Sequence, residues 1–318
     1  MLWSSMESAA LWALRRIDEL TRYKLKERFA VGCAAGAGSG PLPFPTAVVM
    51  SVFVPDSKLV TSVKTSPNHG ERCGRRFPDM VVLHYTGMES AEAALERLRG
   101  IGDQPEPNVS AHYFVYEDGR IVQCVAEARR AWHAGVSSWE GDEDINSRSI
   151  GIEIANPGHD FDYPDFPEEQ IEPLVLLCRD IVARHSIRAD RILAHSDVAP
   201  SRKQDPGEKF PWAGLFEAGV GHWVEPTPLA DGPALKPGDR SAGVSQLQGL
   251  LAEYGYGLNP SGFYGDSTRD VVAAFQRHFR PARVDGIADG STVDTLERLV
   301  IGRRLLLASA GSADAGAP

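Results

Sequence analysis

The stretch LAHSDVAPSRKQDPGEKFPW, residues 193–212, combines a histidine, two aspartates, an Arg-Lys pair and three prolines. His195 follows a short apolar run that is typical of a buried strand, and Asp205 lies in the loop beyond it, directly before Pro206-Gly207. A second histidine, His84, stands near the end of the apolar run DMVVLHYT at 79–86. Two histidines and a carboxylate are a ligand set for catalytic zinc, which keeps a fourth position for water. The alternative is that each histidine is a hydrogen-bonded structural residue.

The elements around these residues predict an α/β domain over 59–225, a mixed central sheet flanked by helices. Strands are predicted at 79–86, 149–155 and 192–194 and in a hairpin at 111–124, and helices at 89–100 and 167–185. His84 and His195 each end a predicted strand, so their side chains can converge over one sheet edge. Pro173 predicts that the second helix starts later than its apolar stripe suggests.

Composition restricts the class of protein. The 318 residues are enough for two domains, and a hydrophobic fraction of 42% is ordinary for a soluble globular chain. The net charge of −10 argues against a nucleic-acid binder, which normally carries a basic patch. The sequence lacks an apolar run of 18 residues, so we expect no transmembrane segment. The four cysteines lack C-x-x-C spacing, which argues against a cysteine zinc site, and Cys124 and Cys178 are expected to be buried.

Residues 1–58 are interpreted as an N-terminal extension, partly disordered, in which 7–28 could form an amphipathic helix. The segment AVGC, which ends at Cys33, is similar to a lipoprotein cleavage site. A signal peptide needs an apolar run before that site, and here YKLKERF occupies the position. The sequence therefore gives no convincing export signal.

Residues 226–318 differ in composition from the predicted α/β domain and divide into three parts. Residues 226–238 are rich in proline and predict a linker, so the parts on either side should be separable. Residues 239–301 contain an internal repeat and predict three short helices, a small domain suited to binding. Residues 302–318 are of low complexity and are predicted to be disordered. Four aromatic residues fall in or next to turns, where they can stack on a ligand or close the core: Tyr254, Tyr256, Phe263 and Tyr264.

Five motifs carry a family resemblance. In order they are VVLHYTG, SAHYFVYEDG, AWHAG, SIGIEIANPGH and AHSDVAPSRKQDPGEKFPW. Together they resemble the zinc-dependent N-acetylmuramoyl-L-alanine amidases of the AmpD/AmiD type, over residues 66–224. The resemblance implies the fold shared with peptidoglycan recognition proteins and phage T7 lysozyme. The C-terminal segment separately resembles the three-helix peptidoglycan-binding domain that is often appended to wall hydrolases.

The resemblance also implies roles for particular residues. One zinc ion per chain would be held by His84, His195 and Asp205, without a cysteine ligand. Glu153 would be the catalytic glutamate, which takes a proton from water and passes it to the leaving amine, and its place on a Gly/Ala strand face favours this role over a salt bridge. Lys203, two residues before Asp205, would stabilise the oxyanion. Structural readings remain open for both: a salt bridge for Glu153 and a solvated loop side chain for Lys203.

Three further residues are candidates for substrate contacts. His133, in AWHAG, is expected to line the cleft, and Asn146 and Arg202 could contact the sugar or the carboxylates of the stem peptide. The expected substrate is peptidoglycan or a muropeptide, and the expected state is a monomer. Whether intact sacculus or 1,6-anhydro-muropeptide is preferred stays open. The missing signal favours a cytoplasmic location, whereas a wall-binding module favours the periplasm or cell wall.

The expected function is hydrolysis of the amide between N-acetylmuramic acid and L-alanine. Two rival functions remain at this point. A non-catalytic peptidoglycan sensor would bind without cutting, but the complete ligand set and Glu153 count against it. A zinc peptidase that cuts within the stem peptide would use the same chemistry on another bond.

Overall fold

The computed structural model describes residues 53–74, 77–102 and 107–314. The interpretation of residues 1–52, including the helix over 7–28 and the cleavage-like site at Cys33, lies outside the described residues. Asp56 already packs against the folded chain, since its backbone N–H donates to Gln123 Oε1 at 2.9 Å. The packed part therefore begins a few residues before the expected boundary at 59. Among the described residues, no helix combines the length and apolar character needed to cross a bilayer.

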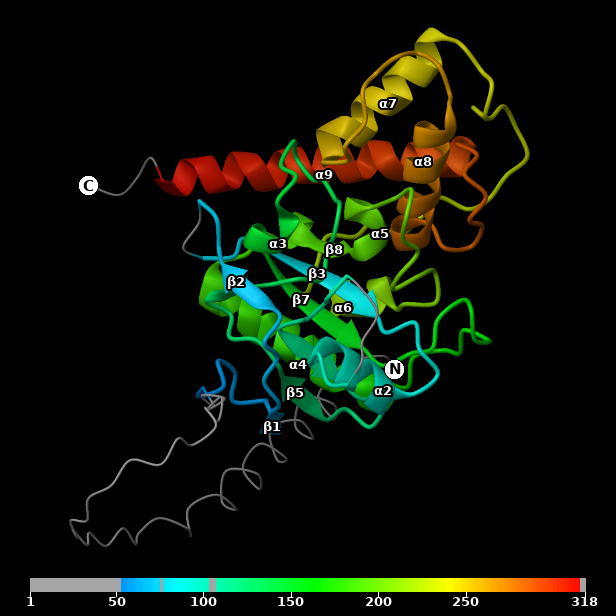
Figure 1. Ribbon diagram of the computed structural model, residues 1–318. Helices are drawn as coiled ribbons and strands as arrows, with labels where there is room; N and C mark the ends of the chain where they lie inside the picture. The colour runs from blue at the N-terminus through cyan, green and yellow to red at the C-terminus, as the bar shows by residue number, and fades with distance from the viewer. Residues whose placement is uncertain (1–52, 75–76, 103–106, 315–318) are drawn as a thin grey trace, which may run out of the picture. The chain divides into compact units, whose positions relative to one another are not determined.

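A six-stranded mixed sheet forms the centre of the molecule, in the order β1-β5-β4-β7-β3-β8 (Figure 1). Its strands are β1 (Ser62–Val63), β3 (Met80–Tyr85), β4 (Tyr113–Val115), β5 (Ile121–Gln123), β7 (Ser149–Ile154) and β8 (Ile192–Ala194). All neighbours run parallel except the hairpin β4–β5. A second, antiparallel sheet pairs β2 (His69–Glu71) with β6 (Arg129–Ala131). The predicted mixed sheet is confirmed.

The register of β3 and β7 determines which side chains meet. His84 lies directly opposite Glu153 across the parallel pair, so both side chains point to the same face of the sheet. On the other face Ile150, Ile152 and Ile154 are fully buried. The alternation read from SIGIEIA is therefore confirmed, and it places a histidine and a glutamate together on an otherwise small-residue face.

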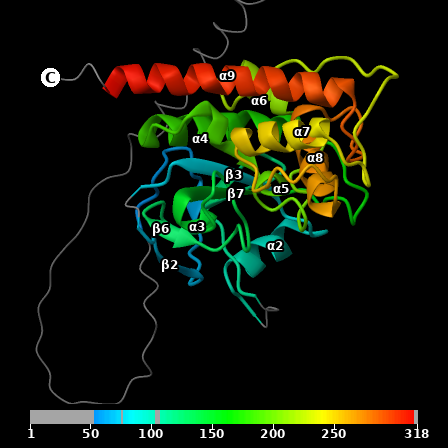
Figure 2. The ribbon, with the colours of Figure 1, turned by 90° about the horizontal axis from the view of Figure 1, so that it is seen from above.

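Helices cover both faces of the sheet (Figure 2). The apolar residues of α4 (Glu168–His185) join the core on the isoleucine face, and those of α2 (Ala91–Leu98) pack with Phe114 and Val122 on the face of His84. Helix α4 starts at Glu168 and holds Pro173 inside it, so the later start expected from the proline is wrong. Shorter helices are α3 (Ile145–Arg148), η1 (Ala189–Arg191), α5 (His195–Val198) and α6 (Trp212–Glu217).

Three helices follow in the C-terminal segment, as expected: α7 (Ala242–Tyr254), α8 (Asp266–Phe279) and α9 (Gly290–Asp314). The expectation of disorder from residue 302 is wrong, because α9 continues to Asp314. Arg303 donates to Asp190 Oδ2 at 2.9 Å, and Arg304 pairs with Glu253 at 2.6 Å. These ion pairs and the helix-forming Arg-Arg-Leu-Leu-Leu run extend the helix beyond the predicted end.

The helical module, residues 239–314, shares its core with the sheet domain, residues 56–225. One continuous buried cluster contains Trp139 and Trp223 of the sheet domain together with Tyr254 and Phe279 of the module. Three of the four turn aromatics are buried in this core, namely Tyr254, Tyr256 and Tyr264, and Phe263 is 37% exposed. The proline-rich segment 226–238 therefore joins two parts that pack together, and the expectation that they are separable is at odds with the structure.

Glu127 ties helix α4 to the sheet. Its buried carboxylate accepts hydrogen bonds from Tyr113 Oη at 2.6 Å and from Arg184 Nη2 at 2.7 Å, and it contacts His185 Nε2 at 2.7 Å. Burial by itself would raise the pKa of Glu127, but the hydrogen bonds from Arg184, His185 and Tyr113 outweigh it and lower the pKa to about 2. The ionised carboxylate is thus part of the folded state.

We expect Glu127→Gln to lower the free energy of unfolding at pH 7 by about 1–3 kcal/mol, because buried donors lose a charged acceptor. A folded pKa below the unfolded value of about 4.3 gives stability that is present above that value and lost as the pH falls towards 2. The difference between the two proteins should therefore shrink over this range in denaturant titrations. Glu117→Gln, at an exposed turn position, is the control. Equal stability of wild type and Glu127→Gln at pH 7 would contradict this role.

Candidate metal centre

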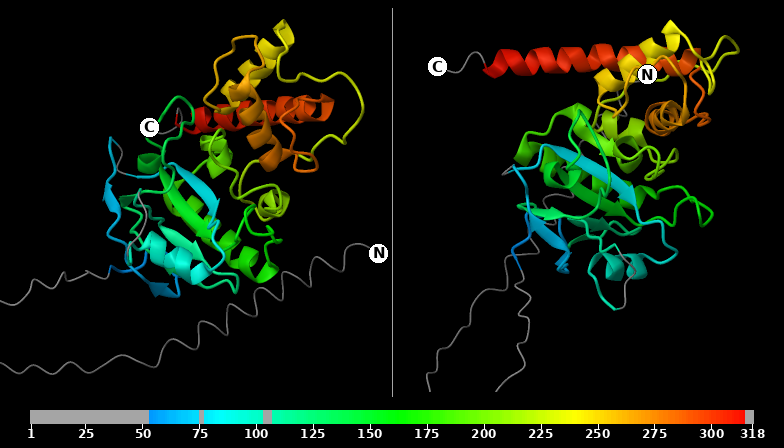
Figure 3. Two further views of the ribbon diagram at one scale, coloured as in Figure 1. Left: turned by 45° about the vertical axis from the view of Figure 1, so that its right-hand side comes forward. Right: turned by 45° about the horizontal axis from the view of Figure 1, so that its top comes forward.

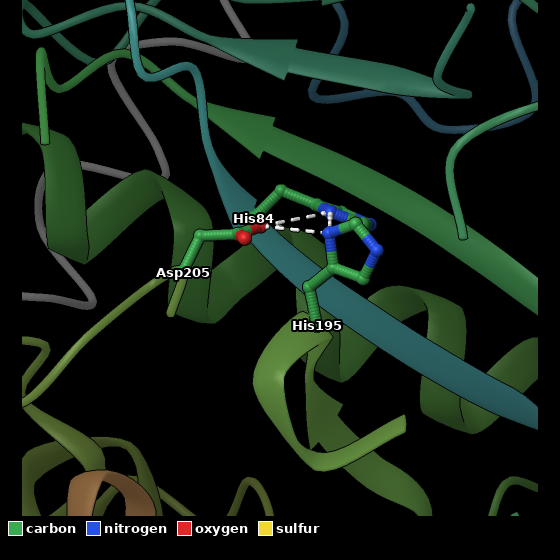
Figure 4. Close-up of side chains that lie close together, drawn as sticks. All are labelled: His84, His195 and Asp205. Atoms are coloured by element: carbon green, nitrogen blue, oxygen red, sulfur yellow. Dashed lines mark hydrogen bonds and ion pairs between the residues drawn. The ribbon is translucent and has the colours of Figure 1, made fainter. Parts of the chain in front are cut away.

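Three side chains converge at the carboxyl ends of β3 and β8 (Figure 4). His84 is the fifth residue of β3, His195 begins α5 directly after β8, and Asp205 lies in the loop that follows. Because β3 and β8 are adjacent and parallel, their ends meet at one sheet edge. The exposed fractions of the three residues are 1%, 3% and 5%. The predicted ligand set is therefore brought together in a buried position.

The facing atoms are His84 Nδ1, His195 Nδ1 and Asp205 Oδ2. The two nitrogens lie 2.9 Å apart, and the Asp205 oxygen lies 3.1 Å from His84 and 3.0 Å from His195. Tetrahedral ligands with bonds of about 2.0–2.1 Å to zinc would be separated by about 3.3–3.4 Å, close to this spacing.

Hydrogen bonds on the far side of each imidazole fix its tautomer. Ser149 Oγ donates to Ile145 O at 2.6 Å, so it accepts from His133 Nε2 at 3.1 Å. His133 Nδ1 is then an acceptor, 3.0 Å from His84 Nε2, and the proton of His84 resides on that nitrogen.

His195 is oriented in the same way. Its Nε2 donates to Ala134 O at 3.1 Å, which leaves the lone pair on Nδ1. Both Nδ1 atoms therefore present lone pairs towards the Asp205 carboxylate. Burial, joined by repulsion from His195, lowers the pKa of His84 to about 4, so a second proton on that ring is disfavoured near neutral pH. The donor set fits a divalent cation bound among the three atoms.

Asn146 has a structural role that the sequence did not predict. Its Oδ1 accepts the backbone N–H groups of His133 at 3.0 Å and Ala134 at 2.9 Å, and the residue is only 7% exposed. Asn146 thus fixes the segment that orients both histidine ligands, and a contact with the sugar or stem peptide stays a prediction.

A cleft of about 440 Å³ opens onto the centre. His133 lines it, as expected, and the other lining residues include Tyr85, Arg97, Arg202 and Lys203. His133 is 8% exposed and acts mainly on His84. The Arg202 guanidinium donates to Ala134 O at 2.9 Å and to Val136 O, so it braces the rim of the cleft.

Glu153 faces the cleft from β7, on the same sheet face as His84. Its Oε2 is buried and has no hydrogen-bond partner among the described residues. Burial, followed by the negative charge of Asp205, raises the pKa of Glu153 to about 8. A carboxyl group that is unpartnered, basic and beside a metal-ligand set is arranged for proton transfer.

One cluster was not predicted from the sequence. Tyr85 Oη lies 3.0 Å from His159 Nδ1, and His159 Nε2 lies 3.1 Å from Glu208. A Cβ on Gly207 would lie 2.3 Å from Tyr163 Oη, so only glycine fits beside the ring that stacks on His159. This packing ties the Asp205 loop to the cleft wall. The only sequence signal was the histidine in NPGH, whose partner lies 49 residues away.

Comparison with known proteins agrees with this geometry. Residues 74–208 match the Amidase_2 family, described as N-acetylmuramoyl-L-alanine amidase, and residues 240–296 match the PG_binding_1 family of peptidoglycan binding domains. The N-acetylmuramoyl-L-alanine amidase AmiD of Escherichia coli K12 is 36% identical over 233 residues, which cover 70% of this chain and 82% of that relative.

Two solved structures are similar as well. An E. coli AmiD complex with anhydro-N-acetylmuramic acid-L-Ala-D-gamma-Glu-L-Lys has a TM-score of 0.60 and 34% identity, covering 74% of this chain and 98% of that one. AmpDh3 of Pseudomonas aeruginosa with an anhydromuramic pentapeptide has a TM-score of 0.56 and 31% identity, covering 74% and 93%. The chain belongs to the N-acetylmuramoyl-L-alanine amidase family, and it is an enzyme of that class.

Gly151 offers a test of the support given by His133. A Cβ at Gly151 would lie 2.4 Å from His133 Cγ, so Gly151→Ala must displace the ring from His84. We expect affinity for added zinc to fall by about 10–100-fold, the usual effect of losing an outer partner of a ligand. Chelator competition measures the affinity, and circular dichroism checks the fold. Gly249→Ala, where nothing lies within 4 Å, is the control. Wild-type affinity in the Gly151 variant would show that His133 does not hold His84 in place.

Proposed function

We propose that this protein is a zinc-dependent N-acetylmuramoyl-L-alanine amidase that cuts the amide between the lactyl group of N-acetylmuramic acid and L-alanine in muropeptides. The observation that carries the proposal is the buried set of His84, His195 and Asp205 with the unpartnered Glu153 in the same cleft. Relatives solved with anhydromuropeptides, at 34% and 31% identity, support this substrate class.

Nδ1 of His84, Nδ1 of His195 and a carboxylate oxygen of Asp205 would hold one zinc ion. When bound, zinc supplies Lewis-acid polarisation of a carbonyl and lowers the pKa of a water to about 7. The chain provides the rest: His133 and Ala134 fix the ring tautomers, and the buried position excludes bulk water from the ligand atoms.

Glu153 would move the proton. Its free oxygen accepts a proton from the attacking water as the carbon–oxygen bond forms, and it returns that proton to the amide nitrogen as the carbon–nitrogen bond breaks. The products are a free lactyl carboxylate and the intact peptide with an L-alanine amino terminus. A pKa raised from the ordinary range towards neutral suits this role, because the same group must both take up and release a proton.

Lys203 and Arg202, which lie close to Asp205 in the sequence, contribute positive charge to the lining of the cleft. Lys203 lines the cleft close enough to Glu153 for its charge to lower the pKa of that carboxyl, against the larger effect of burial. Its ammonium group would stabilise the negative charge that develops on the carbonyl oxygen. Arg202, at the exposed rim, would contact a carboxylate of the stem peptide. The segment 240–296 would hold glycan or peptide of the wall, as its family match suggests.

The metal assignment has a direct test. We expect His195→Ala to bind little zinc, because it removes one of three ligands, and wild type to bind one zinc per chain. Elemental analysis of both proteins measures this, with His69→Ala, a histidine outside the cleft, as the control. Full zinc retention in His195→Ala would refute the assignment.

The catalytic roles are tested with a soluble anhydromuropeptide. Glu153→Gln should slow hydrolysis by about 10²–10⁴-fold because the proton acceptor is lost. Lys203→Ala should lower kcat by about 10²–10³-fold because an oxyanion partner is lost. Both variants should keep their zinc, and mass spectrometry of wild-type products should show the peptide released whole. A near-wild-type rate would exclude the role of the altered residue, and cleavage inside the peptide would identify a peptidase.

A further inference from the structure

Asp197 connects the metal centre to the helical module. It lies in α5, two residues after His195, and is fully buried. Its carboxylate accepts three hydrogen bonds: from the backbone N–H of Ala194 at 2.8 Å, from Tyr256 Oη at 2.7 Å and from His278 Nδ1 at 2.6 Å. Two of these three donors belong to the C-terminal module.

The first turn of α5 depends on this carboxylate. The bond from Ala194 N–H to Asp197 closes the turn that leads from β8 into the helix, and His195 is its first helical residue. The next residue, Ser196, donates its backbone N–H to Asp205 O at 3.0 Å. A shift of α5 would therefore move one metal ligand directly and a second through the backbone.

Packing holds the two distant donors in place. The imidazole of His278 stacks between Trp212 and Phe279, each with a ring-centroid distance of 3.7 Å. Tyr256 packs against Trp139 at 5.0 Å, and it is 2% exposed. Helix α8, which carries His278, lies against α5 (Figure 3). This packing restricts the orientation of both donors towards Asp197.

We infer that the helical module is a structural part of the metal centre, in which Tyr256 and His278 are positioning residues that act on His195 and Asp205 through Asp197. This inference rests on the proposed zinc site and adds a second role to the module besides wall binding. Without Tyr256 and His278, the Asp197 carboxylate would remain in an apolar interior with a single hydrogen-bond donor. Because a buried charge with too few donors is unfavourable, α5 would move to relieve it.

A matched pair of tyrosines separates positioning from general stability. Tyr256→Phe removes the hydroxyl that bonds to Asp197. Tyr264→Phe removes an equally buried hydroxyl of the same module, which bonds to Gly286 O at 2.8 Å within the module. Zinc affinity by chelator competition, the unfolding midpoint, and kcat and KM on a soluble anhydromuropeptide would be measured for the full-length proteins.

We expect Tyr256→Phe to bind zinc about 10-fold more weakly, the lower end of the loss for a direct partner of a ligand, since Tyr256 acts through Asp197. It should lose kcat with little change in KM. Tyr264→Phe should lose stability but keep wild-type zinc affinity. Among variants of His278, His278→Asn, which keeps a donor near Nδ1, should retain more affinity than His278→Leu.

Wild-type zinc affinity in Tyr256→Phe, or the same loss in both tyrosine variants, would overturn the inference. Failure of the wild-type protein itself to bind zinc would instead refute the proposed function, so the two failures are distinguishable.

Discussion

Two imidazole nitrogens with outward lone pairs lie 2.9 Å apart in a buried position, with a carboxylate oxygen about 3 Å from each. Such an arrangement is repulsive unless a cation lies among the three atoms. The surroundings oppose a proton in that role, since burial and the neighbouring ring lower the pKa of His84 to about 4. This constraint explains why β3 and β8 end side by side, and why the far-side nitrogens of both rings are hydrogen-bonded, to His133 and to Ala134 O.

The support of the centre is built in layers. Asn146 fixes the backbone at His133 and Ala134, which in turn orient His84 and His195. Asp197 performs the equivalent task for α5, with donors taken from the helical module. Ligand atoms held in this way do not have to be reorganised when a cation binds, and tight binding at a small site depends on that.

The site could be predicted from the sequence where a residue with a reactive side chain stood at a definite position in a predicted strand. His84 and His195 stand at strand ends and Glu153 on an alternating strand, so their convergence follows from parallel pairing. The structural role of Asn146 was missed because its partners are backbone groups 12 and 13 residues away, and no pattern of side chains in the sequence indicates such a bond. The prolines of 226–238 indicate an extended local backbone, which is typical of a linker. They give no information on the packing of Trp139 against Tyr256, so the module was predicted to be separable. Residues 302–318 were predicted to be disordered because their composition is of low complexity. Composition does not show that Arg303 and Arg304 form ion pairs that extend α9.

The most direct test of the proposed metal centre is a crystal structure of the zinc-loaded protein with anomalous diffraction data at the zinc edge. We expect one anomalous peak, within bonding distance of His84 Nδ1, His195 Nδ1 and an Asp205 oxygen, with His84 Nε2 still donating to His133. A peak bound through Nε2 of either histidine, a peak at another place in the chain, or no peak at all would contradict it.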